Sequence, residues 1–235
     1  MIEIRNLYKK FGKVEVLKGL DLSIKSGGIF AVLGPNGSGK TTLIKSVLGM
    51  VIPNKGDIVI DGNSVLKKHE YRNNINYLPQ IANFPSNLSV NELIKMVKNL
   101  RSKPAVDQDL IELFRLQPFL DKKLGNLSGG TKQKVNLVLT FMFDSELIIL
   151  DEPTTGLDPI SLLNLKKIIL AEKKKGKTIL ITSHIMSFVE EMADEIVFLL
   201  DGKIYFKGTL TAIKEQTKQN DLEHAIAAIL IKEDV

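Results

Sequence analysis

Apolar residues alternate with polar ones near the start of the chain, at 2–7 and again at 20–24. This alternation is typical of strands that bury one face, so we expect two antiparallel strands there. The pattern changes at 29–33, where a continuous apolar run fits a strand buried on both faces. A glycine-rich turn follows, and residues 42–48 have helical character.

The middle of the chain, from 88 to 143, has helix signals and little strand. Ser89 and Glu92 form an S-x-x-E capping box at the start of one helix, and Pro104 ends it. After Leu147, strands and helices alternate. We expect further strands at 58–60, 76–78, 147–150, 178–182 and 196–200, helices at 161–175 and 222–231, and a hairpin turn at Asp201-Gly202.

These elements predict an α/β fold with a mainly parallel sheet, an N-terminal antiparallel β part and a helical insert subdomain. We expect the core to comprise residues 1–84 and 141–208. The insert then spans 85–140, and a helical tail spans 209–235 and packs on the body.

Composition excludes several classes of protein. The 235 residues are 44% hydrophobic and 25% charged and include no cysteine, which argues against global disorder and against a disulfide scaffold. The longest apolar run, 225–231, is far shorter than the roughly 20 residues of a membrane-spanning helix. The first residues have no secretory signal pattern, so we expect a cytoplasmic protein.

The net charge of +5 raises the question of an anionic partner. The basic residues occur in short groups with acidic residues among them. This distribution favours an ordinary solvated surface, and we expect no nucleic-acid partner.

The strongest local signal is the segment Gly34-Pro-Asn-Gly-Ser-Gly-Lys40-Thr41, which matches G-x-x-x-x-G-K-[ST] in full. It lies between a buried strand and a helix, as a phosphate-binding loop requires. Glycines let backbone N–H groups surround phosphate oxygens, and the helix N-terminus adds partial positive charge. Lys40 would neutralise the β and γ phosphates, and the Thr41 hydroxyl would bind Mg²⁺. The motif thus predicts a P-loop nucleoside-triphosphatase core.

Two carboxylates, Asp151 and Glu152, end the apolar strand at 147–150. On their own they fit an ordinary solvated turn. Combined with the phosphate loop, Asp151 is suited to hold Mg²⁺, and Glu152 is suited to polarise an attacking water.

The segment at 54–57 reads Asn-Lys-Gly-Asp, which matches the N-K-x-D pattern of guanine recognition. It lies too early in the chain for that role. Asn, Lys and Gly before a short strand also make an ordinary turn, which is our prediction here.

The segment Leu127-Ser128-Gly129-Gly130-Thr131 lies in the later part of the helical insert and opens another helix. It offers a second anion site, with a hydroxyl and glycine N–H groups at a helix N-terminus. With this feature the sequence resembles the nucleotide-binding subunit of ABC (ATP-binding cassette) transporters over nearly the whole chain, about 2–208.

The motifs of that family occur here in the family's order. The resemblance identifies 34–41 as the Walker A loop, Gln80 as the Q-loop glutamine and 127–130 as the signature motif. It also identifies Asp151 and Glu152 as the Walker B pair, Asp158 as the D-loop aspartate and His184 as the switch histidine. The metal ligands that the resemblance implies are Thr41, Gln80 and Asp151. The catalytic residues that it implies are Lys40, Gln80, Glu152 and His184. The nucleotide-binding residues that it implies are Phe11, Gly34, Pro35, Asn36, Gly37, Ser38, Gly39, Lys40, Thr41, Thr42, Ser128, Gly129, Gly130 and Asp158.

The resemblance further implies how the protein works. Family members form a head-to-tail homodimer with two ATP molecules between the subunits, and Ser128, Gly129 and Gly130 of one copy would contact the γ-phosphate held by the other copy's Lys40. Asp158 would lie at the dimer seam. ATP and Mg²⁺ are the expected cofactors. The expected partner is a separate multi-span permease that holds the subunit at the cytoplasmic face of the membrane and docks on 80–93, where Phe84 and Pro85 are candidate contacts.

Several assignments have alternatives. A lone His is usually structural, but the position of His184 after the strand at 178–182 favours a role beside Glu152 at the γ-phosphate. His69 and His224 have no such context and are expected at the surface. Phe11 is the candidate for stacking on adenine, with Tyr8 as the fallback and a core role for Phe11 as the alternative.

The sequence departs from the family at Thr131, where Gln is common, and at Lys134, where Arg is common. Neither change removes an anion-binding group, so a changed hydrolysis rate is the expected effect. The stretches at 180–187 and 199–203 resemble export subunits of the ABC-2 class, in particular the nitrous-oxide-reductase copper-site maturation ATPase. The alternative functions are a soluble ABC ATPase acting on ribosomes or DNA, and a regulatory module without catalysis.

Overall fold

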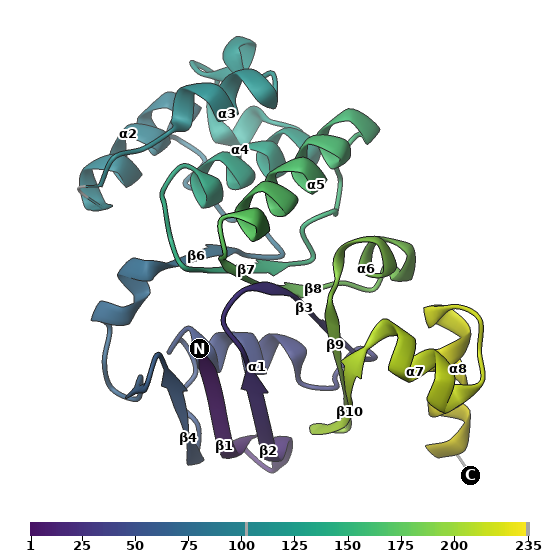
Figure 1. Cartoon of the computed structure of the whole chain (residues 1–235). Helices are drawn as coiled ribbons and strands as arrows, with labels where there is room; N and C mark the ends of the chain where they lie inside the picture. Colours follow the sequence, from purple (N-terminus) through teal and green to yellow (C-terminus); the bar gives the residue numbers. More distant parts are fainter. Residues whose placement is uncertain (102, 234–235) are drawn as a thin grey trace. The chain divides into compact units, whose positions relative to one another are not determined.

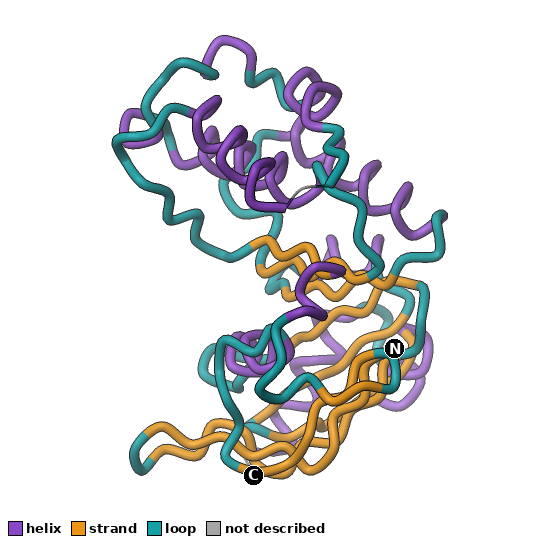
Figure 2. The backbone as a smooth tube through the Cα atoms, turned by 90° about the vertical axis from the view of Figure 1, so that its left-hand side faces the viewer, coloured by secondary structure: helices purple, strands orange, loops and turns teal. Residues whose placement is uncertain are grey.

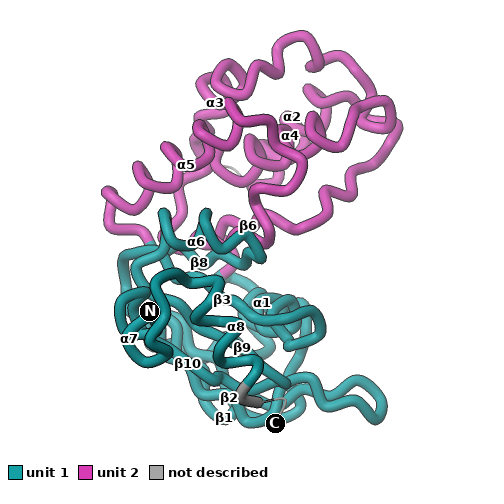
Figure 3. The backbone as a smooth tube through the Cα atoms, turned by 90° about the vertical axis from the view of Figure 1, so that its right-hand side faces the viewer, with its two compact units in different colours: residues 1–71, 178–235 teal, residues 72–177 magenta. Residues whose placement is uncertain are grey.

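The computed structural model describes residues 1–101 and 103–233, so the last two residues of the predicted tail lie outside the described part. The chain divides into two compact units (Figure 3). Unit 1 comprises Met1–Tyr71 and Thr178–Val235, and unit 2 comprises Arg72–Lys177.

Unit 1 contains an antiparallel sheet in the strand order β2-β1-β4-β5. Strand β1 pairs with β2 so that Ile2 lies opposite Ile24 and Ile4 opposite Leu22, all four buried. The predicted antiparallel pair is therefore confirmed, with its apolar residues on the buried face. The strands are β1 (Ile2–Phe11), β2 (Val14–Ile24), β4 (Lys55–Ile60) and β5 (Asn63–Ser64) (Figure 1).

The second set of strands in unit 1 has the order β10-β9-β3-β8. Strand β3 is parallel to both of its neighbours, which explains its continuous apolar sequence. Strands β9 and β10 are antiparallel, and Asp201 and Gly202 between them both have positive φ, as the predicted hairpin turn requires. The strands are β3 (Gly28–Leu33), β8 (Thr178–Thr182), β9 (Glu195–Leu200) and β10 (Lys203–Thr209).

The helices of unit 1 are α1 (Lys40–Val47), α6 (Met186–Met192), α7 (Leu210–Thr217) and α8 (Leu222–Glu233), and a short 3₁₀ turn, Glu70–Asn74, begins at its boundary. Helix α8 buries Leu222, Ala225, Ile226 and Ile229 in a cluster with residues of β3, β9, β10 and α7. The predicted packing of this helix on the body is confirmed.

Unit 2 contains the parallel neighbours β6 (Ile75–Leu78) and β7 (Leu147–Asp151). The insert between them is built mainly from helices and loops, as predicted (Figure 2). The α-helices of unit 2 are α2 (Val90–Arg101), α3 (Asp107–Leu113), α4 (Gly129–Phe141) and α5 (Pro159–Lys174), with 3₁₀ turns at Gln117–Phe119 and Leu124–Asn126.

The capping box before α2 is confirmed. The Ser89 backbone N–H donates to the Glu92 carboxylate at 2.7 Å, and the Glu92 N–H donates to Ser89 Oγ at 3.2 Å. The first hydrogen bond is also the main reason that the pKa of Glu92 is lowered.

The turn predicted at 54–57 is wrong, because β4 already begins at Lys55. Asn54 joins this segment to β1, since its N–H donates to the Tyr8 carbonyl at 2.8 Å and its Oδ1 accepts from the Lys10 N–H at 2.8 Å. Gly56 has a φ of 92° and takes up an irregularity in the pairing of β1 with β4. A positive φ at a glycine therefore marks a bulge here and not a chain reversal.

Candidate nucleotide site

The phosphate loop follows β3 directly, and α1 begins at its last residues. Gly34 has a φ of 150°, and a Cβ at this position would lie 2.1 Å from the Leu199 carbonyl oxygen. Gly39 caps α1 with a φ of 107°, and a Cβ there would lie 2.9 Å from the Leu17 side chain. Both positions require glycine, because the loop backbone is pressed against β9 and β2.

Lys40 lies over its own loop. Its Nζ donates to the Gly34 carbonyl at 2.7 Å and to the Pro35 carbonyl at 3.1 Å. Ser38 is buried, and its Oγ has no hydrogen-bond partner within the described residues. At Gly37, by contrast, a Cβ would meet nothing within 4 Å, so the loop has open space on that side. An oxygen-rich anion fits this arrangement of cation, unpaired hydroxyl and open space.

Strand β2 and the β9–β10 turn pack against the phosphate loop. The Gly202 N–H donates to the Ser38 carbonyl at 3.2 Å, and the Lys18 N–H donates to the Gly202 carbonyl at 2.9 Å. The carbonyl of Val16 is 3.0 Å from the Cβ position at Gly39. The hairpin that bears Phe11 is thus built against the phosphate loop within unit 1.

Phe11 ends β1 and is 50% exposed, so the alternative that it is a core residue is wrong. Lys9 Nζ lies 4.9 Å from the centre of its ring. Tyr8, the fallback, is less available, because it is only partly exposed and its hydroxyl lies close to Gly19.

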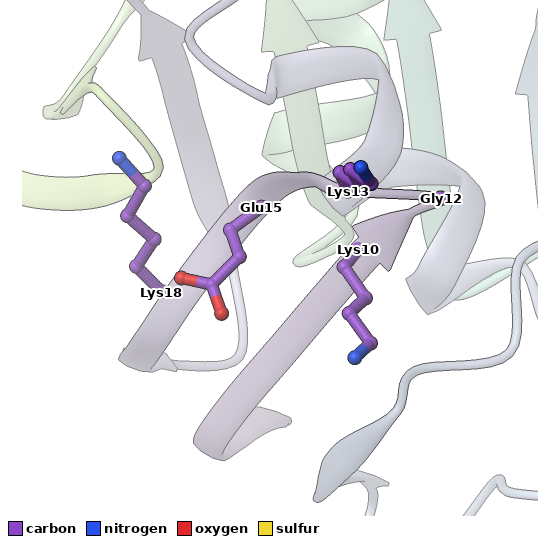
Figure 4. Close-up of a pocket in the computed structure, with 5 residues that line it drawn as sticks. All are labelled: Lys10, Gly12, Lys13, Glu15 and Lys18. Carbon is purple, nitrogen blue, oxygen red and sulfur yellow. The ribbon is translucent and has the colours of Figure 1, made fainter.

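A polar cavity of about 530 Å³ opens on the same hairpin, and both sequence neighbours of Phe11, Lys10 and Gly12, line it (Figure 4). Its walls come from β1, the turn and β2, and Glu15 is its acidic member. Lys18 also forms an ion pair with Asp201 at 2.6 Å. The cavity is lined by Lys10, Gly12, Lys13, Glu15 and Lys18.

His184 lies in unit 1, two residues after β8 ends. Its side chain is exposed. Ser183 before it is buried, and its Oγ accepts a hydrogen bond from the Ile185 N–H at 3.1 Å. His69 and His224 are exposed, as predicted, and His224 pairs with Asp221 at 2.8 Å.

The other motifs lie in unit 2. Asp151 and Glu152 follow one another at the end of β7, and both are at least nine-tenths buried. Glu152 has a φ of 51°, which is unusual for a residue with a side chain and typical of positions that a functional site constrains. Burial and the nearby negative charge of Asp151 raise the pKa of Tyr77 to about 12.

Gln80 is exposed and lies two residues after β6, the parallel neighbour of β7. The carboxyl ends of these two strands therefore carry Gln80 and Asp151 at the same edge, which is where ligands bind in open α/β sheets.

The signature segment opens α4. Ser128 is the N-cap, and its Oγ accepts from the Thr131 N–H at 3.3 Å. The Thr131 hydroxyl lies 2.9 Å from the Ser128 hydroxyl. The residue that departs from the family therefore contacts the hydroxyl that is expected to reach the partner's nucleotide. Gly129 adds no side chain, and a Cβ there would meet nothing within 4 Å.

Asp158 has a clear local role as the N-cap of α5. It accepts from the Ser161 N–H at 2.9 Å and forms an ion pair with Lys134 at 2.6 Å. The hydrogen bond from Lys134 is the main reason that the pKa of this carboxyl lies far below its ordinary range. The D-loop also contacts the signature segment, because a Cβ at Gly130 would lie 2.7 Å from the Gly156 carbonyl oxygen.

Sequence reasoning missed two residues, Gln133 and Asn136 of α4. Both are buried, and their amides donate to the backbone beside the Walker B and Q-loop residues. A polar side chain on a helix is ordinarily expected at the surface, so no sequence signal identified them.

Comparison with known proteins agrees with these features. The sequence profile of the ABC transporter family matches residues 17–155. The Nod factor export ATP-binding protein I of Burkholderia orbicola (strain AU 1054) is 33% identical over 220 residues, which are 91% of this chain and 72% of that protein. The lantibiotic transport ATP-binding protein SrtF of Streptococcus pyogenes is 35% identical over 216 residues, 87% of this chain and 89% of that one.

Solved structures have the same fold. The ATP-binding subunit of an ABC transporter superposes with a TM-score of 0.89 at 29% identity and covers 97% of this chain and 98% of that one. A dimeric ATP-binding cassette with ADP and phosphate bound has a TM-score of 0.80 at 23% identity over 89% of this chain and 99% of that one, a likeness of fold. Within the described residues, no helix has the length and apolar character needed to cross a bilayer. The chain belongs to the ABC transporter family and is one of its ATP-binding subunits, an ATPase.

Proposed function

We propose that this ATPase drives export by a separate membrane permease, and that its phosphate loop, residues 34–42, holds the ATP phosphates. The main support for this proposal is the conformation of the phosphate loop. Glycine is required at two positions by close backbone contacts, Lys40 lies over the loop, and the buried Ser38 hydroxyl has no partner within the described residues. The backbone N–H groups of residues 36–42, none of which is proline, would donate the remaining hydrogen bonds to the phosphate oxygens.

Three of the candidate residues carry oxygen atoms of the kind that Mg²⁺ binds. Within the described residues, no group of three or more His, Cys, Asp or Glu side chains is arranged to hold a metal. Thr41, Gln80 and Asp151 offer hydroxyl, amide and carboxylate oxygens, the donor type that Mg²⁺ prefers. We assign these three as its ligands, with phosphate oxygens completing the set. When bound, the ion would neutralise charge on the phosphates.

Glu152 is the general base in this proposal. Its carboxylate would accept a proton from the attacking water, and the constrained backbone at this residue supports a fixed side-chain direction. His184 would donate to a γ-phosphate oxygen, and Gln80 would orient the water. Lys40 would stabilise charge on the phosphates throughout.

Phe11 is the proposed adenine partner. Half of its surface is exposed at the end of a hairpin that is built against the phosphate loop, and a basic cavity lies beside it. Stacking of a flat base on such a ring contributes about 1 kcal/mol.

Two copies of the chain would complete each site. Ser128, Gly129 and Gly130 of one copy would contact the γ-phosphate bound by the other, and Asp158 would lie at the seam. The exposure of Ser128 and Gly129 at the N-terminus of α4 supports this, because a helix N-terminus with free surface attracts anions. Relatives named for Nod factor export and lantibiotic transport support a permease partner, an export direction and a place at the cytoplasmic membrane face. The more specific resemblance of this chain to the ATPase of nitrous-oxide-reductase copper-site maturation stays a prediction.

The decisive experiment replaces Glu152 by Gln, which keeps the shape and removes the base. Phosphate release should fall by at least about a hundredfold, while ATP with Mg²⁺ should convert the protein to a stable dimer in light scattering. Glu146→Gln, an exposed carboxylate before the same strand, is the matched control and should leave both properties unchanged. Wild-type hydrolysis by the Glu152→Gln protein would refute the assignment.

A further inference from the structure

Helix α4 carries a row of polar side chains on its buried face. Gln133, Asn136 and Thr140 follow at helical spacing, and each is at most 5% exposed. Buried polar groups are costly unless they are hydrogen-bonded, so an apolar residue would be the simple choice at each position. The first two side chains donate to the loops on either side of the proposed catalytic residues, whereas Thr140, outside its own helix, reaches the Tyr77 carbonyl within β6, at 3.4 Å.

The Asn136 amide donates to the Pro79 carbonyl at 3.1 Å. The Gln133 amide donates to the Pro153 carbonyl at 3.2 Å. Pro79 directly precedes Gln80, and Pro153 directly follows Glu152. The two amides also lie 3.5 Å apart, close enough for a weak hydrogen bond from Asn136 to Gln133. One face of α4 is therefore joined to both loops that carry proposed catalytic side chains.

The chemistry at the two acceptors makes these contacts specific. Proline has no N–H, so each loop can offer only a carbonyl at this point, and the side chain that meets it must be a donor. Helix α4 is a 13-residue rod that begins immediately after Ser128. A displacement of its signature end would therefore pull on the backbones beside Gln80 and Glu152 through these two hydrogen bonds.

We propose that Gln133 and Asn136 are positioning residues, which fix the Gln80 and Glu152 loops to the signature helix so that both side chains take their places when the helix N-terminus engages a nucleotide. This inference rests on the proposed function, because it needs Gln80 and Glu152 to act in hydrolysis.

The test uses the full chain with Asn136→Leu, Asn136→Asp and Gln133→Leu. Each removes one amide donor, and Asn136→Asp also keeps the side-chain shape if Leu prevents folding. The turnover number for ATP should fall by roughly tenfold or more, the equivalent of a lost buried hydrogen bond. The dissociation constant for ATP should stay within about twofold, because no phosphate-binding group changes.

Thr140→Val is the matched control. Thr140 lies one turn further along the same buried face. Its hydroxyl donates to the Asn136 carbonyl of its own helix at 2.8 Å and makes only a weak contact, at 3.4 Å, with the Tyr77 carbonyl inside β6. The melting temperature of the Thr140→Val protein should drop about as much as that of the Asn136 variants, but its turnover number should stay near the wild-type value. A purely structural role for Asn136 would make the two sets of variants alike and would overturn the proposal.

A double variant tests whether Asn136 affects turnover through Gln80. If Asn136 acts through Gln80, then adding Asn136→Leu to Gln80→Ala should lower turnover by less than about twofold further. Full additivity contradicts the proposed path. Different results would refute the positioning role and the proposed function. An inactive Glu152→Gln protein beside Asn136 and Gln133 variants with wild-type turnover refutes only the positioning role, whereas an active Glu152→Gln protein refutes the function on which it rests.

Discussion

The glycines of the phosphate loop differ in what surrounds them. Gly34 has no room for a side chain, because the Leu199 carbonyl would lie 2.1 Å from its Cβ. Gly37 has a positive φ but open space around it. The motif therefore contains glycines of two kinds, one required by packing and one required by backbone conformation alone.

Gly34→Ala should accordingly be severe. The methyl group must displace the end of β9, at about 1–3 kcal/mol, and the backbone conformation adds a further cost of about 1–2 kcal/mol. We expect a lower urea midpoint and a loss of ATP affinity by equilibrium titration. Gly62→Ala, with a φ of 78° and nothing within 4 Å, is the control that bears only the second cost. Equal effects from both variants would contradict the packing argument.

The residues of the site were predicted unevenly. Motif spacing predicted the phosphate loop, the Walker B pair and the signature segment, because each motif is local in sequence, and these segments lie at the start of α1, the end of β7 and the start of α4. The pairing of Thr131 with Ser128 and the partners of Gln133 could not be predicted, since the same residue types occur on solvated helices. Only the fold specifies that a carbonyl 20 residues away lies opposite the Gln133 amide.

At the scale of elements, strands with a clear apolar period were predicted correctly, as were the capped helices. The segment 54–57 was misjudged because Asn and Gly favour turns locally, while pairing with β1 decides the outcome. Helix α7 lies within the predicted helical tail, but its own bounds could not be predicted, because its eight residues bury only Ile213 and leave a weak apolar pattern.

Helix α5 ends at a buried ion pair that holds it to the segment before β7. Lys177, with a side chain 6% exposed, bonds Asp144 and Glu172. Lys177→Met leaves the largely buried Glu172 with only the exposed Lys175 as its ion-pair partner and should lower the free energy of unfolding by about 1–3 kcal/mol. Lys175→Met is the control, because this exposed lysine bonds the same Glu172 at 2.7 Å and should cost at most about 1 kcal/mol. Urea unfolding at neutral pH distinguishes the two.

The same cluster has a defined pH dependence. The hydrogen bond from Lys177 lowers the pKa of Asp144 below its ordinary 3.8. Burial raises the pKa of Glu172, but hydrogen bonds from the two lysines outweigh it, and the net pKa lies below 4.5. Burial lowers the pKa of Lys177, yet its two carboxylate partners bring the net value above 10.5. The stabilisation is therefore present at neutral pH, is lost as pH falls through the lowered carboxyl values, and is lost as pH rises through the raised lysine value.

The difference in unfolding free energy between wild type and Lys177→Met should follow this profile. It should be largest between about pH 5 and 10 and decline on both sides. A difference that stays constant down to pH 2 would contradict the ion-pair assignment.

At the scale of the whole molecule, the core of unit 1 joins the two ends of the sequence. Ala31 and Leu33 of the strand before the phosphate loop share a cluster with Leu222 and Ile226 of the last helix. The C-terminal helix thus supports the strand from which the nucleotide site begins.

Leu222→Ala should lower the free energy of unfolding by about 2–5 kcal/mol, because Leu222 is fully buried. Ile231→Ala, on the same helix but 67% exposed, is the control and should change it by less than about 0.5 kcal/mol. Thermal unfolding measures both. Similar melting temperatures for the two variants would show that the helix does not contribute to the core as described.

The parallel pairing of β3 has a consequence for how the chain is made. Gly28 pairs with Thr178 on one side, and Phe30 pairs with Glu195 on the other. At a ribosomal speed of roughly 5–20 residues per second, the apolar segment 28–33 is synthesised about 8–30 seconds before its first neighbour exists. During that interval a short, uncharged, strand-forming sequence has both edges unpaired. Newly made chains should therefore be most prone to self-association at mid-synthesis, and a holding chaperone should bind nascent chains that end before residue 178 more strongly than finished ones.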